Sequence, residues 1–140
     1  ATAQALDEEM KERIQKHKKE RSGDWAIDWA TYEEPFNISA LIKNIHKSHD
    51  VVLIDCLTLW LSNLLLSGLD VDAEIESFAS SIVDSKASFF IVSNEVGLGI
   101  VPDNALSRKF RDMAGRLNQK VAEIADEVYF VVAGIPLKIK

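Results

Sequence analysis

The chain has 140 residues, a length that predicts one domain with a single hydrophobic core. Apolar residues make up 47% and charged residues 27%, which is typical of globular proteins and argues against disordered and fibrous classes. The 16 Lys and Arg residues against 22 Asp and Glu give a net charge of −6. This balance argues against nucleic acid and anionic membranes as partners.

The single cysteine, Cys56, excludes an intramolecular disulfide and a Cys-based zinc cluster. The longest apolar stretch, residues 51–66, is interrupted by polar side chains and predicts no membrane span. The first ten residues lack the pattern of a signal peptide. We therefore expect a cytoplasmic location.

Helical and extended patterns alternate along the chain. The spacing of apolar residues predicts helices over residues 6–21, 38–49, 57–66, 71–85 and 102–124, with Gly68 ending the third. Short strands are predicted over residues 29–33, 51–54, 89–92, 128–132 and 137–139. The runs at 51–54, 89–92 and 128–132 are continuously apolar, which is typical of strands buried on both faces. Residues 1–140 are thus predicted to form one α/β domain with a mostly parallel sheet flanked by helices.

Ligands of such sheets bind at the carboxyl ends of the strands. Asp55 ends the first apolar run, and a carboxylate there can hold Mg²⁺, directly or through water, beside nucleotide phosphates. It can also simply end the strand and cap the next helix. Asn94 and Glu95 follow the second run at the same edge, where Gly97 and Gly99 allow a ligand or another chain close to the backbone. An ordinary strand-to-helix loop explains these residues equally well.

Two helices carry further candidates. His17 lies on the apolar stripe of the first helix, and a neutral imidazole there can attack phosphorus and form a phosphoramidate. A lone histidine in such a place is more often a partly buried, hydrogen-bonded residue. Arg108, Arg111 and Asn118 form one stripe of the long helix, where arginines can clamp phosphate or face solvent.

Several segments together resemble the bifunctional adenosylcobinamide kinase / adenosylcobinamide-phosphate guanylyltransferase family of cobalamin biosynthesis. The most specific segments are Asn-Glu-Val-Gly-Leu-Gly-Ile-Val-Pro at 94–102 and Arg-Asp-Met-Ala-Gly-Arg-Leu-Asn-Gln at 111–119. Supporting segments are residues 1–10, 13–17, 33–35, 55–58, 63–65 and 134–138. The resemblance covers the whole chain.

The resemblance implies a P-loop NTPase fold of the RecA-like kind and two activities. The family phosphorylates adenosylcobinamide with a nucleoside triphosphate, GTP or ATP. It then moves GMP from GTP, through a guanylyl-histidine, to adenosylcobinamide phosphate, giving adenosylcobinamide-GDP. Its histidine matches His17, Mg²⁺ is its metal, and its members are homotrimers with sites between subunits. Matches to its nucleotide-binding positions are Ala1, Thr2, Ala3, Lys18, Lys19, Glu20, Arg21, Glu33 and Asp55.

Two features depart from the family pattern. The family begins with a strand, a Gly-rich phosphate loop and a helix, but these 140 residues contain no G-x-x-x-x-G-K-[ST]. The segment between Arg21 and Glu33 is longer than expected, so residues 22–28 receive no role. We therefore expect this chain alone to be kinase-deficient. Besides the bifunctional enzyme, two alternatives stay open: guanylyl transfer alone, or an inactive α/β module that binds a nucleotide or a partner.

Overall fold

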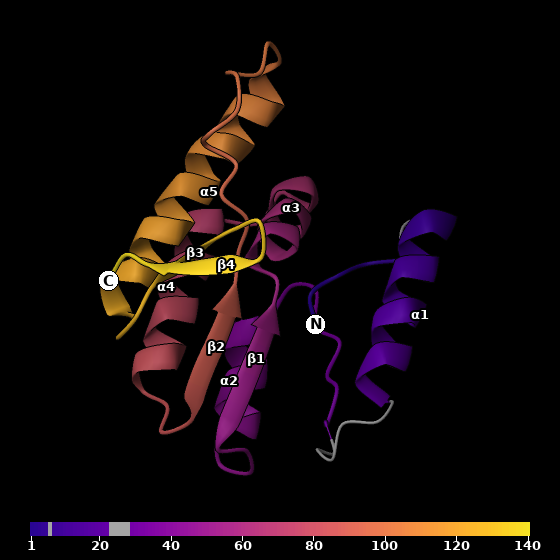
Figure 1. Cartoon of the computed structure of the whole chain (residues 1–140), viewed down its shortest axis with the longest axis vertical. Coiled ribbons are helices and arrows are strands. Elements are labelled where there is room, and N and C mark those ends of the chain that lie inside the picture. The colour runs from indigo at the N-terminus through magenta and orange to yellow at the C-terminus, as the bar shows by residue number, and fades with distance from the viewer. Residues whose placement is uncertain (6, 23–28) are drawn as a thin grey trace.

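The computed structural model describes residues 1–5, 7–22 and 29–140, arranged as five helices and four strands within those ranges (Figure 1). The helices are α1 (Glu8–Ser22), α2 (Ile38–Ile45), α3 (Leu57–Ser67), α4 (Val71–Val83) and α5 (Ala105–Ile124). The strands are β1 (Val51–Asp55), β2 (Ser88–Val92), β3 (Tyr129–Val132) and β4 (Ile135–Lys138). The α/β class predicted from the sequence is confirmed.

Local capping chemistry sets the ends of the helices. Asp70 accepts a hydrogen bond from Ala73 N–H at 3.1 Å, and α4 begins at the next residue. Asn104 accepts one from Ser107 N–H at 2.8 Å, so α5 begins at Ala105, a little later than predicted. Gly68 follows α3 with a φ of 73°, the left-handed conformation that its lack of a Cβ permits. The predicted end of α3 is therefore confirmed.

Two separate strand pairs replace the larger parallel sheet that we predicted. β1 and β2 are parallel, with Asp55 opposite Val92. β3 pairs with β4 in an antiparallel hairpin, so the prediction that residues 128–132 join the parallel strands is wrong for the described residues. The hairpin forms because Ala133 and Gly134 both have positive φ (52° and 77°), as its two-residue turn needs. Residues 29–33 form no strand.

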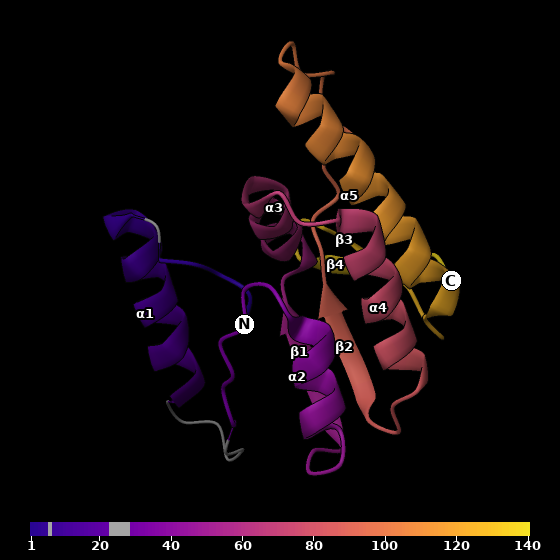
Figure 2. The ribbon, with the colours of Figure 1, turned by 180° about the vertical axis from the view of Figure 1, so that it is seen from behind.

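Among the described residues, α2 and α4 cover one face of β1 and β2, and the other face is exposed. Figure 2 shows α2 and α4 in front of β1 and β2, and the core fills this side around Leu57, Trp60 and Phe78, which are completely buried. On the opposite face Val51 is 48% exposed and Phe90 63% exposed. The prediction that these strands are buried on both faces is therefore wrong. A continuous apolar run shows which residues can be buried, but not what covers them.

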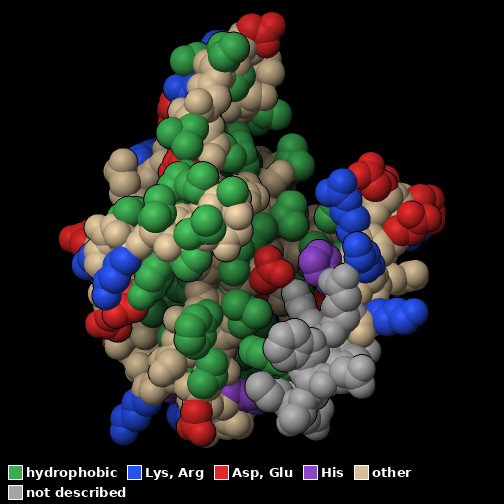
Figure 3. Space-filling model, viewed as in Figure 1, with side chains coloured by type: hydrophobic (Ala, Val, Ile, Leu, Met, Phe, Trp, Pro, Cys, Tyr) green, Lys and Arg blue, Asp and Glu red, His purple; other side chains and the backbone are tan. Residues whose placement is uncertain are grey.

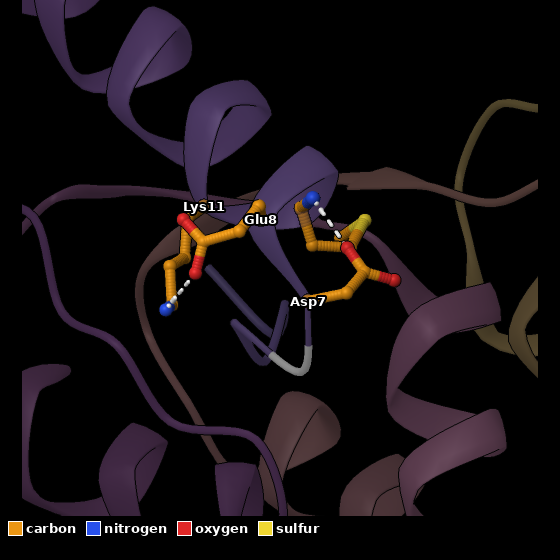
Figure 4. A network of polar contacts seen from close by, with 4 residues as sticks. Asp7, Glu8 and Lys11 are labelled. Atoms are coloured by element: carbon orange, nitrogen blue, oxygen red, sulfur yellow. Dashed lines mark hydrogen bonds and ion pairs between the residues drawn. The ribbon is translucent and has the colours of Figure 1, made fainter.

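Helix α1 lies to one side of the body in both ribbon views (Figures 1 and 2). Asp7 caps it by accepting from Met10 N–H at 2.7 Å, and Lys11 pairs with Glu8 in the first turn (Figure 4). Of the predicted apolar stripe, Met10 and Ile14 are half-buried, His17 is exposed, and Leu6 lies outside the described residues.

We find no helix in the described ranges that is both long enough and apolar enough to cross a membrane.

Candidate functional site

The first residues of the chain are bound to the carboxyl end of β1. Thr2 N–H donates to the Asp55 carbonyl at 3.2 Å. The Thr2 hydroxyl donates to the Cys56 carbonyl at 2.7 Å and accepts from Cys56 N–H at 3.0 Å. Thr2 is buried, so these contacts fix residues 1–3 beside Asp55, and the hydroxyl itself serves as an anchor. The Asp55–Cys56 peptide bond is cis.

A buried amide in α3 joins this segment to the chain around Pro35. Asn63 Nδ2 donates to the carbonyls of Thr2 (2.8 Å) and Pro35 (3.0 Å). Sequence analysis missed Asn63 as a site-forming residue. The signal was present, because a polar side chain inside the apolar pattern of α3 is buried only with hydrogen-bond partners.

Residues 32–34 lie next to residue 1 and connect the site to α1. Glu34 N–H donates to the Ala1 carbonyl at 3.0 Å, and the Ala1 nitrogen donates to the Tyr32 carbonyl at 2.7 Å. The Glu33 carboxylate pairs with Lys18 Nζ at 2.7 Å, and both side chains are about half exposed. The pair holds the second half of α1 against residues 32–34.

The structure thus brings together a set of residues predicted from the sequence, which we call the β1-edge cluster: Ala1, Thr2, Ala3, Lys18, Glu33 and Asp55. His17 precedes Lys18 on α1 and is exposed. Figure 3 shows acidic, basic and His side chains gathered where α1 faces the body. Lys19 is also exposed on α1. The side chains of Glu20 and Arg21 lie outside the described part, as do residues 23–28 of the segment 22–28 to which no role was assigned.

The end of β2 lies at the same sheet edge, as predicted. Because Asp55 is opposite Val92, Ser93 and Asn94 continue alongside Cys56 and the start of α3. Asn94 N–H donates to the Thr58 hydroxyl at 2.8 Å. Asn118 of α5 accepts from the Ser93 hydroxyl at 2.6 Å and donates to the Asn94 carbonyl at 3.3 Å.

The two arginines of the α5 stripe bind the loop that follows Asn94. Arg108 Nη1 donates to the carbonyls of Pro102 (3.1 Å) and Asp103 (2.5 Å), and Arg111 Nη1 donates to that of Gly99 (3.4 Å). In this structure both guanidinium groups therefore contact the protein's own backbone. Their predicted contact with phosphate stays a prediction.

Glu95 is turned back toward its own loop. Its Oε1 accepts from Gly97 N–H at 2.7 Å, and a Cβ at residue 97 would lie 2.7 Å from the same oxygen. Glycine at this position thus allows the close approach of a carboxylate, where the sequence suggested the approach of a ligand.

Asp55 is the candidate for a magnesium contact. Within the described ranges no three His, Cys, Asp or Glu residues are grouped tightly enough to bind a metal ion by themselves. The half-buried Asp55 carboxylate at the sheet edge fits Mg²⁺, because this ion takes one or two carboxylates and completes its shell with water and phosphate oxygens.

Two ion pairs elsewhere in the fold shift the pKa values of their members. Hydrogen bonds from Lys138 and from the Tyr129 hydroxyl lower the pKa of Glu127, next to the β3–β4 hairpin. A hydrogen bond to Glu76 raises the pKa of Lys120, which links α5 to α4. These groups do not belong to the β1-edge cluster.

Comparison with known proteins agrees with the resemblance. Residues 1–139 match the family model described as cobinamide kinase / cobinamide phosphate guanyltransferase. The chain belongs to this family. It is 42% identical to the bifunctional adenosylcobalamin biosynthesis protein CobP of Pseudomonas aeruginosa, over 100% of this chain and 80% of the relative. It is 41% and 40% identical to the bifunctional adenosylcobalamin biosynthesis proteins CobU of Salmonella typhimurium and Escherichia coli, over 83% of each.

Proposed function

We propose that this protein acts in cobalamin biosynthesis as a cobinamide kinase and cobinamide phosphate guanylyltransferase. The observation that supports the proposal is the β1-edge cluster: residues from four separate parts of the chain lie at the sheet edge where α/β folds bind ligands. The resemblance implies that these residues bind nucleotide. A RecA-like P-loop fold is the architecture that we propose for it.

In the guanylyl transfer, His17 is the proposed nucleophile. Its neutral ring nitrogen attacks the α-phosphorus of GTP, the N–P bond forms, and the bond from this phosphorus to the bridging oxygen breaks. Pyrophosphate leaves, and the proton on the other ring nitrogen goes to solvent. A phosphate oxygen of adenosylcobinamide phosphate then attacks the same phosphorus, the N–P bond breaks, and the imidazole takes a proton back from solvent as adenosylcobinamide-GDP is released.

We propose that the ion pair between Lys18 and Glu33 opens when the nucleotide binds, and that both side chains then contact the nucleotide. Their ion pair is half exposed, and pairs of this kind contribute about 0–1 kcal/mol, so little is lost when it opens. Lys18 is then available for phosphate and Glu33 for hydrogen-bond donors of the nucleotide. Lys19, Glu20 and Arg21, which follow in α1, are proposed to contribute further contacts.

Asp55 is proposed to hold Mg²⁺ through water. Bound there, the ion would neutralise charge on the nucleotide phosphates. Asp55 itself contributes a fixed carboxylate, because its main-chain carbonyl is anchored by Thr2 and its strand is paired with β2.

For a polypeptide limited to residues 1–140, a second candidate is guanylyl transfer without kinase activity. The observation that favours it is the absence from this sequence of a G-x-x-x-x-G-K-[ST] loop, which cradles the transferred phosphate in P-loop enzymes.

We also propose a homotrimer, as the resemblance implies. Sedimentation at micromolar concentration tests that state, and a monomer would contradict it.

The function is tested by incubating the purified protein with GTP, Mg²⁺ and adenosylcobinamide phosphate and measuring products by mass spectrometry. We expect adenosylcobinamide-GDP and pyrophosphate in equal amounts. Nucleotide binding without either product would instead support an inactive binding module.

A further inference from the structure

Two helices hold the backbone of a single residue at the ligand edge. The Thr58 hydroxyl on α3 accepts from Asn94 N–H at 2.8 Å, and Asn118 Nδ2 on α5 donates to the Asn94 carbonyl at 3.3 Å. Asn118 Oδ1 also accepts from the Ser93 hydroxyl at 2.6 Å. We call these four residues, Thr58, Ser93, Asn94 and Asn118, the Asn94 bridge.

The bridge connects the two strand ends. Thr58 lies in the first turn of α3, shortly after the end of β1 at Asp55, whereas Asn94 follows β2. Its hydrogen bonds therefore set the distance between the loop after β2 and the helix that begins beside Asp55. The side chains of Asn94 and Glu95 are exposed at this edge, where they can meet a substrate.

The fold itself does not require these bonds. All three are exposed, and water can satisfy the backbone of a surface loop. Of the loop after β2, Val96 packs against the buried core, and it takes no part in these three hydrogen bonds. Two further side chains of α5 also bind the backbone of this loop: Arg108 and Arg111 donate to carbonyls farther along it. The common effect of these contacts is to fix where the loop lies.

We infer that Thr58 and Asn118 are positioning residues for the transfer reaction. They hold Asn94 and Glu95 at a fixed place relative to Asp55, so that the substrate meets a preformed edge. This inference rests on the proposed function. A displacement of about 1 Å at a reacting centre can lower a rate about a hundredfold, so a positioning role predicts an effect on kcat.

The test uses the full natural protein with GTP, Mg²⁺ and adenosylcobinamide phosphate. Thr58→Val removes the hydroxyl at constant shape, Thr58→Ser restores it, and Asn118→Asp keeps the acceptor for Ser93 but removes the donor to Asn94. Lys109→Ala, an exposed change on α5, is the control. The measurements are kcat and KM for GMP transfer, and hydrogen exchange of a peptide covering residues 93–104.

We expect Thr58→Val and Asn118→Asp to accelerate exchange in this peptide about tenfold, because each loses one hydrogen bond. We expect kcat to fall at least about tenfold while KM for GTP changes less than about twofold, with Thr58→Ser and Lys109→Ala close to wild type. Faster exchange with unchanged kcat would overturn the positioning role. Unchanged exchange would overturn the bridge itself. A wild-type protein that transfers no GMP would instead overturn the proposed function.

Discussion

At the scale of single residues, Asp55 is a charged side chain at a partly buried position where a cation could bind. Its carboxylate is half-buried at the end of β1, where a charged group must be solvated, hydrogen-bonded or paired with a cation. The backbone around it is fixed by Thr2, so the carboxylate is held in place at little entropic cost when a ligand arrives.

We predict that Asp55→Asn weakens Mg²⁺-dependent GTP turnover much more than it lowers the melting temperature. The amide keeps the shape of the side chain and removes the charge, so the fold is kept while the attraction for Mg²⁺ is lost. Turnover measured against Mg²⁺ concentration should show a higher requirement for the metal. A wild-type rate at limiting Mg²⁺ would count against this role.

At the scale of elements, α3 organises the site from the buried side. Its first turn holds Asn94 through Thr58, its middle holds Thr2 and Pro35 through Asn63, and its apolar side chains fill the core. One helix therefore connects the core to the segments that carry the candidate ligand-binding residues.

We predict that Asn63→Ala destabilises the protein by about 1–3 kcal/mol, because the buried Thr2 carbonyl and the part-buried Pro35 carbonyl lose the donor that Asn63 supplies. GTP affinity should fall as well, since residues 1–3 and 33–35 are no longer held together. Urea unfolding and GTP titration measure the two effects. Leu66→Ala, on the same helix and 65% exposed, is the control and should change neither. A free energy of unfolding equal to wild type in Asn63→Ala would show that these hydrogen bonds do not contribute to stability.

The elements differ in how well the sequence predicts them. α3 and α4 were predicted within a few residues, because apolar spacing and capping residues are local signals. The pairing of the strands was not predicted correctly, since an apolar run does not specify which strand it pairs with. The turn at Ala133 and Gly134 pairs β3 with β4 instead. The strand predicted at 29–33 is wrong because the backbone of residues 32 and 34 bonds to residue 1. Such a contact between distant segments has no local signal.

At the scale of the whole molecule, one face of the strands is left open. Leu53, Phe90 and Val92 on β1 and β2 are exposed, as are Val131 and Leu137 on the β3–β4 hairpin. Figure 3 shows apolar side chains spread over this face. We expect this exposed apolar surface to be the main difference between polypeptide 1–140 and an α/β domain whose sheet is covered on both faces.

We predict that polypeptide 1–140 forms little or no adenosylcobinamide phosphate from adenosylcobinamide and ATP or GTP. Phosphoryl transfer depends on positioning and charge stabilisation around the transferred phosphate, and the only Gly-x-Gly of this chain, at 97–99, is not followed by Lys and Ser or Thr. A product assay with an established adenosylcobinamide kinase as the positive control measures this. Equal rates for the two would contradict the prediction.

The central claim is that His17 carries GMP during the transfer. The measurement is incubation of the complete protein with GTP labelled at the α-phosphate and Mg²⁺, followed by denaturation and counting of protein-bound label. The account predicts label that is stable in alkali and lost in acid, as expected of a phosphoramidate, present in a His46→Gln control and absent from His17→Ala. Undiminished label in His17→Ala would contradict the account.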